Sequence, residues 1–221
     1  MSHKIPRWLS GYFEVSDQNK IHELIQRVET KTSAELVPLI VHSSIDLSLF
    51  RQFVVSLCLL LTVALTPWIG SLWGWSSWAS LEITGLILGL ILVTLGFFAT
   101  ESSLFVRLFF SKQSLQKWVH RRACYEFFAN RLHSSESRTA VLFMYSLLEK
   151  KAMIIADTTL DAIPEHVWQE AVTKMISAAK QKDFCLGFKE AIEFTAEALS
   201  RHYPAQVLNK NEIADHVLFK E

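Results

Sequence analysis

The chain has 221 residues, and its 22 Lys and Arg residues balance its 22 Asp and Glu residues to a formal net charge of zero. This balance argues against a nucleic-acid partner, because a nucleic-acid binder needs a surplus of basic side chains to neutralise phosphates. Hydrophobic residues make up 50% of the sequence, which excludes a disordered or low-complexity chain. The cysteines Cys58, Cys124 and Cys185 lie far apart, so we expect neither a disulfide scaffold nor a zinc site.

The first predicted elements are a helix and a strand. Ser16 or Asp17 can cap the helix. Its apolar positions recur at the spacing of one helical face: Ile21, Leu24, Ile25 and Val28. The apolar run 36–41 then predicts a strand. Because Pro38 in this run has no amide hydrogen for a sheet ladder, we expect the strand at a sheet edge.

Residues 52–100 contain a single charged side chain, Glu82. A membrane-spanning helix needs roughly 20 apolar residues, so this segment predicts a hairpin of two spans, 53–68 and 83–99. Four tryptophans, which favour the headgroup layer, lie in or next to the inter-span segment 70–78: Trp68, Trp73, Trp75 and Trp78. The alternative is a buried helical hairpin of a soluble protein, which we disfavour because polar faces are nearly absent.

The distribution of basic residues predicts the orientation of these spans. The inter-span segment contains no Lys or Arg. Five basic residues follow the second span: Arg107, Lys112, Lys117, Arg121 and Arg122. We therefore expect both termini in the cytoplasm and the tryptophan-rich segment on the other side of the membrane. Neither span carries an embedded charge of the kind that ion and substrate pathways use, which argues against a channel or transporter.

The second half of the chain predicts two further strands between helices. A helix over 115–132 has one stripe formed by Trp118, Tyr125, Phe128 and Leu132. The run 140–148 is apolar on both faces, as in a central strand, and a turn at 149–151 folds a third strand, 152–156, back along it. Two final helices start near Pro164 and Asp183.

The predicted fold class is therefore α/β, with a small mixed sheet flanked by helices. The first and second strands are parallel across a crossover, and the second and third are antiparallel. A two-helix transmembrane hairpin interrupts the domain. The expected boundaries are 1–51 for the first part of the cytoplasmic domain, 52–100 for the hairpin, and 101–221 for the second part with the C-terminal tail.

Several short sequence segments together resemble the TPM domain family, in particular its membrane-inserted bacterial members. The segments are Thr32-Ser33-Ala34-Glu35-Leu36-Val37-Pro38, Arg138-Thr139-Ala140-Val141-Leu142, Ser146-Leu147-Leu148-Glu149, Ile154-Ile155-Ala156-Asp157, Trp168, His202-Tyr203-Pro204 and Asn211-Glu212-Ile213-Ala214-Asp215. The resemblance implies an α/β sandwich and a location in the bacterial inner membrane. Some relatives are described as acid phosphatases that bind divalent ions, and others as membrane-associated assembly or maintenance factors.

No P-loop, nucleophile elbow, His-Glu-x-x-His or Cys-x5-Arg motif is present. Polar residues do gather at the predicted strand ends: Glu35, His133, Arg138, Asp157 and Asp161. Carboxylates can ligate Ca²⁺ or Mg²⁺, and arginine can hold a phosphate, so these residues form one candidate ion or phosphate site. The alternative, which we favour, is an Asp157–Arg138 ion pair with loop capping.

Two functions follow as expectations. The favoured one is a non-catalytic interaction or membrane-maintenance module, tethered to the lipid bilayer and docking a protein partner that the sequence does not name. The alternative is a weak phosphatase that depends on Ca²⁺ or Mg²⁺ and uses the strand-end carboxylates. The favoured function needs no cofactor. The lack of a recognisable nucleophile favours it over the enzyme.

Overall fold

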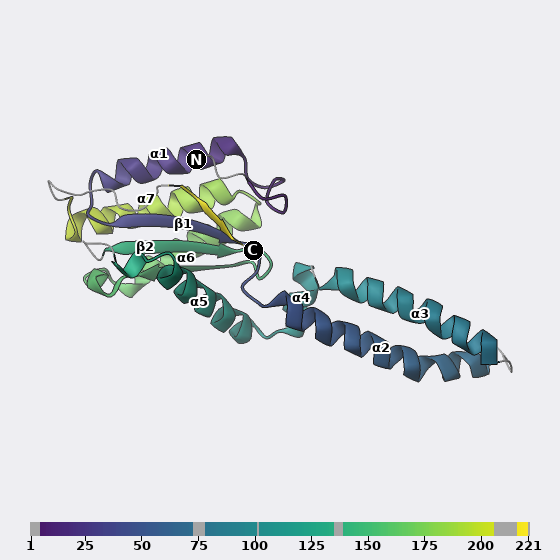
Figure 1. The fold of residues 1–221 in the computed structure, drawn as a ribbon. Helices are drawn as coiled ribbons and strands as arrows, with labels where there is room; N and C mark the ends of the chain where they lie inside the picture. Colours follow the sequence, from purple (N-terminus) through teal and green to yellow (C-terminus); the bar gives the residue numbers. More distant parts are fainter. Residues whose placement is uncertain (1–4, 73–77, 101, 135–138, 206–215, 221) are drawn as a thin grey trace. The chain divides into compact units, whose positions relative to one another are not determined.

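The structure is a computed structural model that describes residues 5–72, 78–100, 102–134, 139–205 and 216–220. The described part contains seven α-helices and four strands (Figure 1). The chain forms two compact units. The first, called the α/β unit here, combines Met1–Ser44 with Gln113–Glu221, and the second, the helical unit, is Ile45–Lys112. The helical unit is therefore longer at both ends than the apolar segment 52–100.

The α/β unit is built on a mixed sheet with the strand order β3-β2-β1-β4. Its strands are β1 (Glu35–Val41), β2 (Ala140–Ser146), β3 (Lys151–Ala156) and β4 (Leu218–Lys220). The predicted pairings are confirmed: β1 is parallel to β2, and β2 is antiparallel to β3. The short β4, which the sequence analysis missed, runs parallel to β1 on its other side.

The predicted edge position of β1 is wrong, because β1 lies between β2 and β4. Pairing with β4 begins only at Leu39, one residue after Pro38. Along the β4 side of β1, the Leu36 amide donates to a Glu29 side-chain oxygen and the His42 amide donates to Lys220. Pro38 falls between them, where β4 has not begun, so its missing amide hydrogen costs no ladder bond.

Helices cover both faces of the sheet. Helices α1 (Val15–Glu29), α6 (Glu165–Lys180) and α7 (Phe184–His202) bury their apolar stripes in one core, and α5 (Lys112–Ala129) contributes to the other. Figure 1 shows α1 and α7 on one side of the sheet and α5 on the other. The predicted α1 stripe is buried. The N-cap is Glu14, and Asp17 completes a capping box with it.

The face of α5 that packs on the sheet differs from the predicted one. Its buried apolar residues are Leu115, Val119, Ala123 and Phe127. Of the predicted stripe, Leu132 is buried, whereas the exposed fraction is 37% for Trp118, 65% for Tyr125 and 60% for Phe128. The buried face includes small side chains such as Ala123, which allow the helix to approach the sheet closely.

The helical unit contains two helices that are long and apolar enough to cross a membrane. They are α2 (Leu47–Leu72) and α3 (Trp78–Ala99), and their apolar segments Ser48–Ser71 and Glu82–Ala99 have a mean hydropathy of 2.1 with 11% of residues buried. Pro67 lies inside α2, which continues to Leu72 beyond the predicted end of the first span. The tryptophans Trp73 and Trp75 lie outside the described residues.

Small residues form the contact between α2 and α3. Gly85 and Gly89 lie against Thr66 and Thr62, and a Cβ atom added at Gly96 would lie 2.9 Å from the Cys58 sulfur. Such small residues let two helices approach closely without a hydrophobic driving force, as in membrane hairpins. The large apolar side chains of both helices instead face outward.

The base of the hairpin is aromatic. Helix α4 (Ser103–Phe109) returns to the start of α2, where the Phe50 ring lies 5.9 Å from Phe109 and 5.1 Å from Phe110. The Arg51 guanidinium lies 4.4 Å from the centre of the Phe97 ring, a cation–π contact between α2 and α3. The hairpin therefore ends in a packed aromatic cluster that also carries cationic residues.

Candidate functional site

A hydrogen-bonded joint closes the amino ends of β1 and β2. The Tyr203 carbonyl accepts hydrogen bonds from the Thr32 hydroxyl at 2.6 Å and from the Ser33 amide at 3.0 Å. The Thr139 hydroxyl donates to the Ser33 carbonyl at 2.5 Å. Three of the short segments that carry the family resemblance thus meet here. Together they fix the loop before β1 in this structure.

The joint extends to the loop after β3 through the Tyr203 side chain. Its hydroxyl donates to the Thr159 carbonyl at 2.7 Å, accepts from the Ala162 amide at 3.2 Å and lies 3.5 Å from an Asp161 carboxylate oxygen. Asp157 is the N-cap of the short helix η2 (Thr158–Leu160), and its side chain accepts from the Thr159 amide at 3.5 Å. The predicted loop-capping role of Asp157 therefore matches this geometry.

The structure brings three of the predicted site residues to one end of the sheet. Glu35 is 3% exposed and pairs with Ala140, whose carbonyl accepts from the Asp157 amide at 2.9 Å, and Asp161 follows in the next loop. His133 instead packs its ring 5.1 Å from Phe128 of the α5 layer. Arg138 lies outside the described residues, so the predicted Asp157–Arg138 pair stays a prediction. The C-terminal segment 211–215 of the family resemblance lies outside the described residues as well.

This arrangement gives the carboxylates of Asp157 and Asp161 structural partners. Within the described ranges, no three His, Cys, Asp or Glu residues form a group that could hold a metal ion. A hard cation such as Ca²⁺ needs several oxygen ligands converging on one point. Asp157 and Asp161 are engaged with the backbone and with Tyr203, so the local chemistry here is capping and loop anchoring.

A second polar cluster, at the carboxyl ends of β1 and β2, was not predicted. Glu149 is 1% exposed, and one of its carboxylate oxygens accepts from the Ser43 hydroxyl and the Ser44 amide, each at 3.1 Å. The Ser146 hydroxyl donates to the other oxygen. The turn backbone adds two bonds, from Leu147 to the Val41 carbonyl and from Leu148 to the His42 carbonyl, each at 3.0 Å.

We call the residues Ser43, Ser44, Ser146 and Glu149 the exit clamp, because they hold the chain where it leaves β1. Ser44 is the last residue of the first segment of the α/β unit, so the clamp fixes the point from which the helical unit starts. The sequence held one signal for the exit clamp, because Ser146 and Glu149 are the polar residues of one of the segments that resemble the TPM domain family. The turn was interpreted only as a turn, because the pairing partners Ser43 and Ser44 lie more than 100 positions away.

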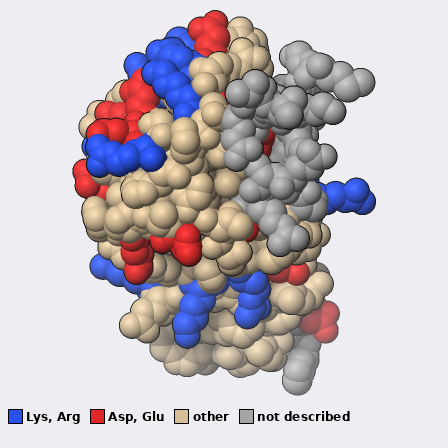
Figure 2. Space-filling view, turned by 90° about the vertical axis from the view of Figure 1, so that its left-hand side faces the viewer, with Lys and Arg blue, Asp and Glu red and all other residues tan. Residues whose placement is uncertain are grey.

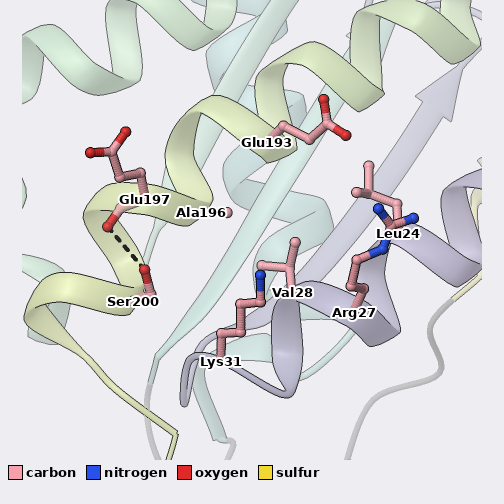
Figure 3. A pocket seen from close by; sticks show the side chains of 8 residues that line it. All are labelled: Leu24, Arg27, Val28, Lys31, Glu193, Ala196, Glu197 and Ser200. Carbon is pink, nitrogen blue, oxygen red and sulfur yellow. Dashed lines mark hydrogen bonds between the residues drawn. The ribbon is translucent and has the colours of Figure 1, made fainter.

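A shallow groove of about 380 Å³ runs between α1 and α7 (Figure 3). Arg27 lies on α1 and Lys31 just after its end, and Glu193 and Glu197 come from α7. Figure 3 shows these charged side chains around an opening floored by small and apolar residues. The opposite charges of its two walls suit mutual attraction between the helices more than binding of an ion of one sign.

Neither the face shown in Figure 2 nor the Cys185 thiol indicates a reactive site. Figure 2 shows acidic and basic residues interspersed on one face of the molecule, without a large patch of one sign. Burial raises the pKa of the Cys185 thiol to about 11. A thiol with this pKa stays protonated at neutral pH, so Cys185 is unsuited to act as a nucleophile.

No protein-family model matches the chain, and no curated protein matches it. Among solved structures, the chain is similar to the NMR structure of BA42 protein from the psychrophilic bacterium Bizionia argentinensis. The two share 14% sequence identity with a TM-score of 0.57, and the match covers 94% of this chain and 95% of that chain. At this identity the likeness concerns the fold, and it supports the mixed α/β architecture.

Proposed function

We propose that this protein is a membrane-tethered member of the TPM domain family whose α/β unit is a non-catalytic interaction or membrane-maintenance module. The hairpin anchors it in a bacterial inner membrane with both termini in the cytoplasm. The proposed partners are the lipid bilayer and a protein that docks on the α/β unit. The observation that carries the proposal is the exposure of the apolar segments of α2 and α3, in each of which only 11% of the residues are buried.

The contacts within the hairpin support a membrane as its environment. The inward contacts use glycine, threonine and cysteine, whereas Leu60 is 68% exposed and Leu90 is 69% exposed. A soluble hairpin would bury its leucines and expose its small polar residues. The reverse arrangement is typical of helices whose solvent is lipid.

The experiment uses the outward leucines. The double variant Leu60→Arg/Leu90→Arg places one charge on each helix, and each charge costs about 2.5–3.5 kcal/mol at the centre of a bilayer. We expect the wild type to resist extraction of native membranes with alkaline carbonate and the double variant to be released or degraded. The control Leu60→Phe/Leu90→Phe should stay in the membrane. Release of the wild type by carbonate would contradict the proposal.

The alternative function is a weak phosphatase that depends on a divalent ion. It is supported by the family resemblance and by the common location of Glu35, Asp157 and Asp161 at one end of the sheet. The two functions differ in phosphate release from a generic phosphoester by the detergent-purified chain, with and without Ca²⁺ or Mg²⁺. We expect no ion-dependent release. Release that is lost in Asp157→Asn would favour the enzyme.

A further inference from the structure

Among the described residues, helix α5 carries a second apolar face that remains largely exposed. Trp118, Tyr125 and Phe128 are exposed together with Arg121, and their spacing of three, four and three residues places all four on one side of the helix. We call these four residues the outer stripe. Monomeric soluble proteins rarely expose a continuous aromatic stripe of this kind without a binding role.

The charge on the exposed surface of α5 is of one sign. The helix contains four basic residues, Lys112, Lys117, Arg121 and Arg122, and a single acidic one, Glu126. Glu126 is 1% exposed and forms ion pairs with Arg122 at 3.0 Å and Lys220 at 3.8 Å. The only carboxylate of α5 is therefore neutralised inside the unit, and the exposed charges of the helix are cationic.

The aromatic and cationic side chains of the outer stripe are interleaved. The Arg121 guanidinium lies 5.2 Å from the centre of the Trp118 ring, a cation–π contact that holds the charge beside the indole. Tryptophan and tyrosine favour the interfacial layer of a bilayer because they have an apolar ring and a polar group. Lysine and arginine are attracted to its anionic headgroups. The stripe combines both preferences on one helix.

The covalent connection keeps this helix near the membrane. Residues 100–111 join α3 to α5, and seven of them form α4. At about 1.5 Å per helical residue and about 3.5 Å per extended residue, the connection spans at most roughly 30 Å. The start of α5 is therefore tethered within reach of the headgroup layer at the end of α3, at a high effective concentration.

We propose that the outer stripe of α5 lies on the anionic headgroup layer of the membrane that the hairpin crosses. This inference rests on the proposed membrane tether and deepens it, because it assigns α5 as the surface by which the α/β unit contacts lipid. The occupant is a bilayer with anionic headgroups, since a charge-neutral protein partner would leave the one-signed charge of the helix without a complement.

The test uses the full chain in lipid nanodiscs, with the three native cysteines replaced by alanine. A fluorophore is attached at Tyr125→Cys, or at Ser177→Cys on α6, which packs on the opposite face of the sheet. Lipids with a nitroxide on the headgroup then quench a fluorophore that lies at the surface. We expect strong quenching at position 125 in discs that contain phosphatidylglycerol, and weak quenching at position 177.

Variants that remove basic side chains measure the preference of α5 for anionic lipid. Each basic residue at such a surface changes the docking equilibrium about fivefold, so Lys117→Gln/Arg121→Gln lowers the ratio of docked to undocked unit by roughly 25-fold. The quenching should also fall in about 1 M salt, where the Debye length is about 3 Å. Equal quenching at positions 125 and 177, or equal quenching at position 125 in neutral and anionic discs, would overturn the inference.

These outcomes separate the inference from the proposed function. A chain that stays in the discs after carbonate treatment, with no preferential quenching at position 125, keeps its membrane tether and loses the lipid contact of α5. A chain that never enters the discs contradicts both statements.

Discussion

Removing the Glu149 carboxylate should destabilise the α/β unit more than removing any exposed carboxylate. Glu149 is buried and accepts hydrogen bonds from Ser43, Ser44 and Ser146. A hydrogen bond to a charged group contributes about 1.5–3 kcal/mol. Glu149→Ala loses all three and leaves hydroxyls without their acceptor, so we expect a loss of about 4 kcal/mol. This is a large share of the roughly 5–15 kcal/mol that stabilises a typical domain.

The assay is proteolysis of the detergent-solubilised full chain across a urea series, with cleavage within residues 113–221 quantified by mass spectrometry. With a typical urea dependence of about 2 kcal/mol per molar, Glu149→Ala should lower the unfolding midpoint by about 2 M. Glu149→Gln keeps one oxygen acceptor and should cost about 1–2 kcal/mol. The control Glu170→Ala, at an exposed ion pair with Lys174, should stay within about 0.5 kcal/mol. A Glu149→Ala midpoint equal to that of the control would refute the exit clamp.

Three further predictions test other parts of the structure. Gly96→Cys should form a disulfide with Cys58 under mild oxidation, because a Cβ atom at position 96 lies 2.9 Å from the Cys58 sulfur. The control Gly89→Cys faces Thr62 and should keep its thiol. Free thiols at both positions 58 and 96 in the Gly96→Cys chain would contradict the pairing of α2 with α3. Cys185 should react with iodoacetamide at pH 8 about 100-fold more slowly than a free thiol of pKa 9.0, since its own pKa is about 11. Mass spectrometry of the modified peptide measures the rate. Equal rates for Cys185 and a free thiol would show that the Cys185 thiol is not shielded. Asp157→Ala should lower stability by about 0.5–2 kcal/mol, the value of a helix cap, whereas Asp157→Asn should keep the cap and change stability little. Millimolar Ca²⁺ should not raise the melting temperature of the wild type; an ion-dependent rise that is lost in Asp157→Asn would instead indicate a cation site.

Much of the fold could be predicted because its signals are local. The apolar spacing of Ile21 and its neighbours defines the α1 face, and the continuous apolar run 140–146 defines a strand covered on both sides. The hairpin follows from hydropathy alone. Strand pairing followed from the lengths of the connections, since a long crossover favours parallel pairing and a tight turn favours antiparallel pairing.

The errors and omissions all involve contacts between distant residues. Pro38 correctly indicated a missing ladder partner, but only a strand at Leu218–Lys220 explains why β1 is still central. On α5, both faces are apolar, so periodicity could not decide which face meets the sheet. The exit clamp joins Glu149 to Ser43 across the entire hairpin, and no spacing rule links residues at that separation.

Site-directed thiol labelling tests the proposal that the hairpin crosses a membrane with the α/β unit in the cytoplasm. In a chain without its native cysteines, Ser76→Cys reports on the inter-span segment and Ser177→Cys reports on α6. We predict that a membrane-impermeant maleimide labels position 76 in intact bacterial cells, and labels position 177 only after the membrane is permeabilised. Labelling of position 177 in intact cells would contradict the orientation, and equal labelling of both positions only after permeabilisation would contradict the membrane crossing itself.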